Sequence, residues 1–219
     1  MKNLIIGGII VLAVVLSVPQ IIQAQGTTYL SNLSQPSTGS EAVGSDSWLA
    51  AEFFTGNNVS GYELNSIQLA MTDPSGNPTD FTAMLYQHIF GSVFLGPNLG
   101  TLEGSANPST ADIYTYNPAG NLTLSPNDYY VIVLTAGTAV ADGAYEWSES
   151  TTSPISSDGW AENSFFFYSS NDGSFWAAIS GTYPQFAINA TAVPEPGVLG
   201  LFVVGGLGFL WHRRKAKAV

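Results

Sequence analysis

The chain has 219 residues, no Cys and a formal net charge of -11. Once its two apolar ends are set aside, about 170 residues remain, enough for one domain with a single core. The lack of Cys excludes a disulfide framework and a thiolate metal site, so stability must come from packing and backbone pairing.

The placement of charge is more informative than its sum. All five basic residues lie near the two ends of the chain: Lys2, Arg213, Arg214, Lys215 and Lys217. Fifteen of the sixteen acidic residues lie between Glu41 and Asp172, a stretch without Lys or Arg. Each of these acids must therefore be solvated, hydrogen-bonded or metal-bound. Nucleic acid is not expected as a partner, because phosphates need Lys or Arg to neutralise them.

The N-terminus has the pattern of a secretory signal peptide. Lys2 precedes an apolar run from Leu4 to Val18, and a small residue, Ala24, follows. This pattern predicts a signal helix over residues 1–24 that is read by Sec-type export machinery and cut after Ala24. A retained membrane anchor is the alternative.

Residues 25–192 contain short strand-like runs separated by turn clusters, and no stretch with helical periodicity. Ten such runs, rich in β-branched and aromatic residues, predict an all-β fold: an antiparallel β-sandwich or jelly-roll-like domain. The predicted strands are Thr28–Leu33, Trp48–Thr55, Glu63–Met71, Phe81–His88, Asp112–Tyr116, Tyr129–Ala136, Tyr145–Ser150, Ser164–Tyr168, Phe175–Ile179 and Gln185–Thr191.

Turn residues separate several of these strands. Asp73–Pro78, Asn117–Gly120 and Asn171–Gly173 contain the Asn, Asp, Pro and Gly residues that favour turns, and the last of these predicts a hairpin. The Tyr129–Ala136 run is almost continuously apolar, which indicates a central strand covered on both faces.

Three segments resemble a known family of β-sandwich domains. Trp48–Phe54, Ser66–Leu69 and Leu124–Leu134 are similar to strand patterns of the choice-of-anchor R family, whose members are commonly followed by a C-terminal sorting tail. The resemblance would cover residues 27–191. Its motifs are strand patterns and imply no chemistry.

Catalytic signals are weak. His88 is the only His before the C-terminal segment, and no Gly-x-Ser-x-Gly elbow accompanies it. Glu146 and Glu149 are the most suggestive carboxylate pair, but residues three apart on a strand point to opposite faces. The sequence therefore predicts no enzyme, with a secreted glycosidase as a distant alternative.

Two ligand hypotheses remain open. Asp73, Asn77 and Asp80 offer oxygen ligands for Ca²⁺ within one segment, although they do not form an EF-hand loop. Ordinary turn capping by these residues is the competing interpretation. Trp147, Trp160 and Trp176 lie near predicted loops and could stack on sugar rings, whereas aromatic residues of a sandwich more often fill its core.

Residues 193–219 form a three-part C-terminal segment. Pro194, Glu195 and Pro196 break regular structure, and the 14 apolar residues Val198–Trp211 follow. At 1.5 Å per residue this helix would be about 21 Å long, shorter than the roughly 30 Å hydrocarbon layer. The cluster Arg213, Arg214 and Lys215 should stay in the cytoplasm by the positive-inside rule, which places the acidic domain outside.

This order of a Pro-Glu-Pro tripeptide, a short apolar helix and a basic tail resembles the PEP-CTERM sorting signal. The resemblance implies removal of the tail by an exosortase, a membrane-embedded transpeptidase. It also implies a Gram-negative envelope, a transient stay in the inner membrane, and a final place at the cell surface or in an extracellular polysaccharide matrix. An ordinary tail anchor after a proline linker is the alternative.

The sequence therefore predicts a non-catalytic exported protein without a cofactor. A carbohydrate-binding module of the same matrix is the first alternative function.

Overall fold

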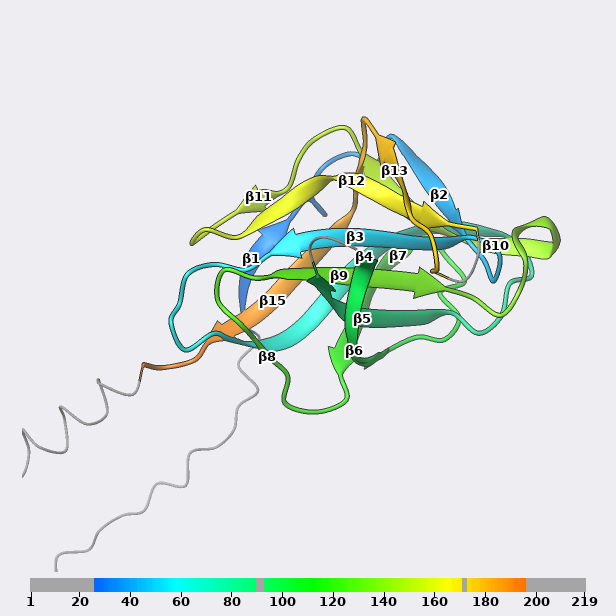
Figure 1. Ribbon diagram of the computed structural model, residues 1–219. Helices are drawn as coiled ribbons and strands as arrows, with labels where there is room; N and C mark the ends of the chain where they lie inside the picture. Colours follow the sequence, from blue (N-terminus) through cyan, green and yellow to red (C-terminus); the bar gives the residue numbers. More distant parts are fainter. Residues whose placement is uncertain (1–25, 90–92, 171–172, 196–219) are drawn as a thin grey trace, which may run out of the picture.

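The computed structural model describes residues 26–89, 93–170 and 173–195. Within these ranges the chain is all-β, and its single helical turn is the 3-10 segment η1 at Val140–Asp142 (Figure 1). The strands are β1 (Thr27–Ser31), β2 (Gly39–Val43), β3 (Trp48–Phe54), β4 (Tyr62–Gly76), β5 (Thr82–Ile89), β6 (Val93–Glu103), β7 (Asp112–Pro118), β8 (Thr123–Leu124), β9 (Tyr129–Thr135), β10 (Gly143–Ser150), β11 (Ile155–Ser156), β12 (Ala161–Ser169), β13 (Ala177–Ser180), β14 (Tyr183–Pro184) and β15 (Phe186–Ala192).

The strands pair along one path in the order β11-β1-β15-β4-β7-β6-β5-β9-β3-β12-β13. Strand β10 lies off this path and pairs with β4, β2 and β14. All of the pairs are antiparallel, which confirms the predicted class. The two halves of this path are joined between β6 and β7. These strands share two residue pairs, Leu102 with Pro118 and Glu103 with Asn117.

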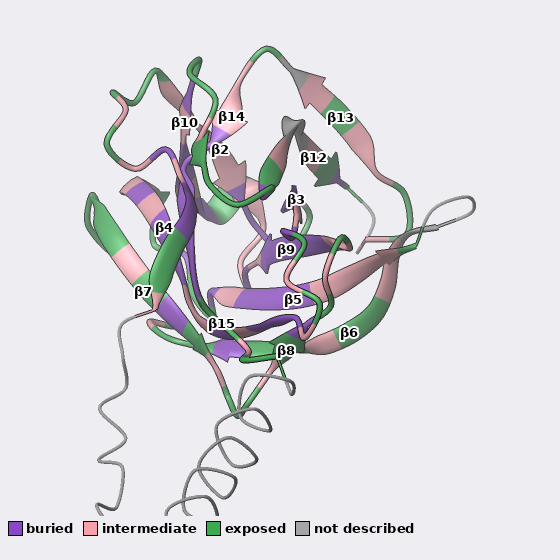
Figure 2. Cartoon of the chain, turned by 90° about the vertical axis from the view of Figure 1, so that its left-hand side faces the viewer, coloured by how far each residue is buried: buried purple, intermediate pink, exposed green. Residues whose placement is uncertain are grey.

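The two halves of this path pack against each other across the main core (Figure 2). Ile67 of β4 and Ile188 of β15 contribute from one half, and Phe53 of β3, Leu85 of β5 and Ile132 of β9 contribute from the other. All five side chains are fully buried. The two packed halves agree with the predicted sandwich, since alternate residues of each strand face the shared core.

Strand β9 is buried on both of its faces. It lies between β5 and β3, and its Ile132 and Leu134 point into the main core. The alternate residues Val131 and Val133 belong to a second cluster with Ala50. Partly buried side chains pack against this second cluster: Trp48, Tyr86, Leu95, Phe167 and Trp176. The predicted central strand covered on both faces is therefore confirmed.

One predicted turn is wrong. Strand β4 continues through Asp73 and Pro74 to Gly76, where the turn residues had predicted a break. The extension pairs with β10, and the register shifts between Ala144 and Glu146, opposite Pro74. A bulge accommodates proline because the missing N–H is not needed in the ladder there.

The Asn171–Gly173 prediction agrees with the pairing of its flanking strands, because β12 and β13 are antiparallel neighbours. Residues 171–172 themselves lie outside the described residues, as do the predicted signal helix at 1–24 and the predicted helix at Val198–Trp211. In the described ranges no helix has the length and apolar character needed to cross a membrane.

Candidate functional site

The two ends of the described chain lie side by side. Strand β15 is held between β1 and β4, so the first and last strands are direct neighbours. Thr27 pairs with Ala190, and Ala192 pairs with Tyr62 at the final rung of the β15–β4 ladder. Figure 1 shows β1 and β15 side by side, with the described chain ending beyond β15. Segments that precede and follow the domain therefore start from one place.

A turn fastens the chain just beyond the last strand. The Val193 N–H donates to the Gly61 carbonyl oxygen at 3.0 Å, and the Asn58 Nδ2 donates to the Val193 carbonyl oxygen at 3.0 Å. The same Asn58 amide donates to the Gly61 carbonyl oxygen, and the Gly61 N–H donates back to the Asn58 carbonyl oxygen. We call this arrangement of residues 58–61 around Val193 the exit clamp.

The exit clamp needs glycine at position 61. Gly61 has a φ of +78°, and a Cβ there would lie 2.4 Å from the Leu124 carbonyl oxygen. A side chain at this position would both strain the backbone and collide with β8. The clamp is thus a specific local structure and not a generic loop.

A group of aromatic rings packs next to the clamp. Tyr62 lies against Tyr29 and Trp160, with ring centroids 5.1 and 4.9 Å away and edge-on orientations, while Tyr29 stacks on Trp160 at 5.0 Å. The Tyr62 hydroxyl accepts a hydrogen bond from the Asn58 N–H. Burial, with smaller contributions from Tyr62 and Asp158, raises the pKa of Tyr29 and keeps its hydroxyl neutral. Packed aromatic rings of this kind stabilise the end of the domain on which the clamp lies.

The sorting tripeptide begins where these contacts end. Pro194 and Glu195 are exposed, in contrast to the buried residues Phe186–Ala190 of β15. Pro196 and the basic cluster Arg213, Arg214 and Lys215 lie outside the described residues. The first two residues of the tripeptide are thus exposed and outside the strands, so they are accessible without unfolding of the domain.

The described chain therefore ends in two exposed residues directly after a clamped strand end. Residues 192–215 match the model of the PEP-CTERM protein-sorting motif, so the chain carries that motif. The motif implies export, processing by an exosortase and a surface or extracellular location in bacteria. No curated protein matches the chain, and no solved structure does.

The hypothesis that three tryptophans stack on sugar rings is wrong for two of them. Trp147 is fully buried and its Nε1 donates to the Gln185 carbonyl oxygen at 3.0 Å, while Trp160 is buried in the aromatic support of the clamp. A buried ring cannot stack on a sugar. Trp176 is half-buried against the second cluster, and its Nε1 donates to the Gly173 carbonyl oxygen.

The Ca²⁺ candidates occupy separate local environments. Asp73 lies on β4 and its Oδ1 accepts from the Ala111 N–H at 2.8 Å. Asp80 has a φ of 55° in the loop before β5 and accepts from the Thr79 hydroxyl, and Asn77 directly follows β4. In the described ranges no group of three or more His, Asp or Glu side chains is arranged to hold a metal ion.

Sequence reasoning missed a contact between two ionisable side chains on the second face of β3 and β5. His88 Nδ1 contacts Glu52 Oε1, and the Glu52 side chain is almost fully buried. The alternation of β3 could have pointed to Glu52, since it shares a face with Trp48 and Ala50. Of the suggested carboxylate pair on β10, Glu146 accepts a hydrogen bond from the Ser40 hydroxyl and Glu149 is the cross-strand partner of Gly39.

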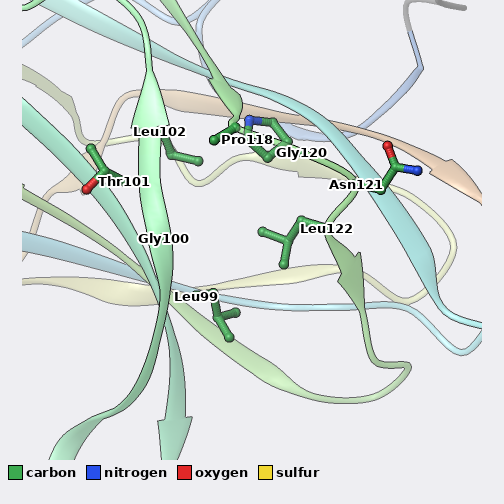
Figure 3. Close-up of a pocket in the computed structure, with 9 residues that line it drawn as sticks. Leu99, Gly100, Thr101, Leu102, Pro118, Gly120, Asn121 and Leu122 are labelled. Atoms are coloured by element: carbon green, nitrogen blue, oxygen red, sulfur yellow. The ribbon is translucent and has the colours of Figure 1, made fainter.

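A cavity of about 120 Å³ lies beside β6 and the loop after β7, and Figure 3 shows the side chains of Leu99 and Leu122 at it. Its other lining residues are Gly100, Thr101, Leu102, Pro118, Ala119, Gly120 and Asn121. Ligand sites usually enclose about 300–1,000 Å³ and contain convergent polar groups. This cavity is smaller, and none of its lining residues ionises.

Proposed function

We propose that this chain is a non-catalytic exported protein of the cell surface or extracellular matrix, processed by an exosortase at its C-terminal tail. The observation that carries the proposal is the match to the sorting motif at residues 192–215, which starts at the end of β15 and continues into the exposed Pro194 and Glu195. The domain then serves as cargo, and the tail serves as the address.

The finer steps follow from the arrangement of charge and apolar segments. In a Gram-negative cell, a signal peptide and Sec-type machinery would export the domain from the cytoplasm. The short Val198–Trp211 helix would then hold the chain briefly in the inner membrane. Arg213, Arg214 and Lys215 would keep the tail end in the cytoplasm, because charges resist transfer across the bilayer. Association with extracellular polysaccharide is the final part of the proposal, and a glycan array on the mature protein tests it.

Replacing Pro194, Glu195 and Pro196 together by alanine tests the processing step. The change removes the extended acidic element and leaves the apolar segment intact, so unprocessed chain should accumulate in the membrane fraction. Neutralising Arg213, Arg214 and Lys215 is the matched comparison and should impair retention and orientation instead. Intact-mass analysis of the mature protein decides the question. Peptides from Val198 to Val219 in mature extracellular material would show an ordinary retained anchor.

A further inference from the structure

The exit clamp fixes the last backbone groups before the sorting tripeptide. Both the N–H and the carbonyl oxygen of Val193 are hydrogen-bonded to the turn at residues 58–61. Thr191 and Ala192 are already exposed but still paired with β4, whereas the exposed Pro194 and Glu195 belong to no strand. The transition from fixed to accessible backbone therefore falls directly before Pro194.

Most residues just before the clamp are held in the sheet and are not free to bind an enzyme in extended form. Strand β15 is paired with β4 from Phe186 to Ala192 and with β1 from Ala187 to Ala190, and its residues Phe186–Ala190 are buried. An enzyme that binds an extended substrate finds backbone outside the sheet and the clamp only from Pro194 onward, unless the domain opens. Pro194 also has no N–H and a fixed φ, so the backbone that leaves the clamp is already restricted.

Holding a segment in place removes an entropic cost from its recognition. Ordering the backbone of one residue changes an equilibrium constant by a factor of about 5 to 30. A tripeptide that leaves a fixed point samples fewer positions than one on a loose linker, so more encounters with the enzyme have a productive geometry.

We propose that Asn58 is a positioning residue for tail processing: it ties Val193 to the folded domain and so presents the sorting tripeptide to the processing enzyme. The inference rests on the proposed function. It assigns to the domain a part in its own sorting, through one side chain 135 residues away from Val193 in the sequence.

Asn58→Asp in the full-length chain tests this role in the producing cell. The substitution keeps the side-chain size and the Asn58 N–H bond to Tyr62, but places a carboxylate oxygen against the carbonyl oxygens of Gly61 and Val193. A pulse-chase measurement of precursor conversion should show a rate slower by about fivefold, the lower end of the ordering factor above, because the Val193 N–H bond to Gly61 remains. Asn121→Asp adds the same charge at an exposed loop position and should leave the rate unchanged.

A second variant leaves every domain residue in place. Insertion of Gly-Ser-Gly-Ser between Val193 and Pro194 separates the tripeptide from the clamp by a flexible linker, so conversion should slow here too. Unchanged or faster conversion in both variants overturns the positioning role. The triple alanine variant of Pro194, Glu195 and Pro196 separates the two ideas: if conversion also survives that change, the proposed function itself fails.

Discussion

Glu162 is an acidic residue whose carboxyl group is buried. It lies on β12 opposite Phe53, and its two carboxylate oxygens are buried without a hydrogen-bond partner among the described residues. Burial raises the pKa of the Glu162 carboxyl group from 4.5 to about 9. The folded protein therefore keeps this group protonated at neutral pH, because an ionised carboxylate there would lose its hydration.

This shift has a defined effect on the pH dependence of stability. Below pH 4.5 the carboxyl group is protonated in both states, and between about pH 4.5 and 9 the unfolded chain ionises while the folded one does not. The contribution to stability is therefore present at low pH and is lost as the pH rises. Glu162→Met removes the ionisable group and with it this loss of stability. At pH 7 the unfolding free energy of the variant should therefore exceed that of the wild type by on the order of 2 kcal/mol.

Urea unfolding of the two proteins from pH 5 to pH 8 measures the difference. The gap in unfolding free energy should widen with pH, whereas Glu103→Gln at an exposed position of β6 should give a profile parallel to the wild type. Parallel profiles for Glu162→Met as well would show that the group is ionised in the folded state.

At the scale of elements, β9 is the strand on which both clusters depend. Its Ile132 and Leu134 belong to the main core, and its Val131 and Val133 belong to the second cluster. The second cluster is covered by side chains that are only partly buried. Its contribution to stability can be measured by changing polarity without changing shape.

Val133→Thr should destabilise the protein by about 1–3 kcal/mol, because the new hydroxyl group loses water at a fully buried position. Val59→Thr is the matched control, since Val59 is 77% exposed and surface changes are usually within about 0.5 kcal/mol. Both values come from chemical denaturation. Equal effects of the two substitutions would mean that the second face of β9 is open to solvent.

The elements also show where sequence patterns stop being informative. All ten predicted runs overlap strands, although Phe175 and Trp176 precede β13, because alternation or continuous apolarity marked the residues that face a core. Strand β6 escaped prediction since Gly96, Pro97 and Gly100 read as breakers, and its pairing with β5 comes from tertiary contact. Strand β2 is mostly half-buried and carries little pattern, while β8, β11 and β14 have two residues each.

The candidate site divides in the same way. Pro194 and Glu195 were found from their order and spacing in the chain, which are properties of sequence alone. The exit clamp was not, because Asn58 and Val193 meet only through the fold. The tryptophans failed as a platform for the same reason: their aromatic character was visible, but the face on which each lies was decided by strand register.

On the scale of the whole molecule, one sign of charge dominates. The fifteen acids between Glu41 and Asp172 have no Lys or Arg in that stretch to offset them. Mutual repulsion among them opposes the compact state. Salt shortens the range of this repulsion from about 10 Å at 0.1 M to about 3 Å at 1 M.

The Tm of the mature protein should therefore rise with added NaCl and stay unchanged with reductant, since the chain has no Cys. CaCl₂ at matched ionic strength separates screening from binding, because a specific Ca²⁺ site would add stability beyond that of NaCl. A flat Tm across the NaCl series would show that the carboxylates are too dispersed to repel one another. Differential scanning calorimetry provides all three readings.

The pairing of β1 with β15 has a consequence for folding. Thr27 and Ala190 lie about 160 residues apart, so the rung that joins them is among the most non-local contacts of the domain. High contact order slows folding. Because the first strand of this sheet pairs with the last, the sheet cannot be completed while only part of the chain has emerged. A chain that crosses a membrane with its N-terminus leading could thus complete this sheet only after the Phe186–Ala192 segment has passed. Completion of the fold and arrival of the C-terminal signal at the outer face would then be a single event in time.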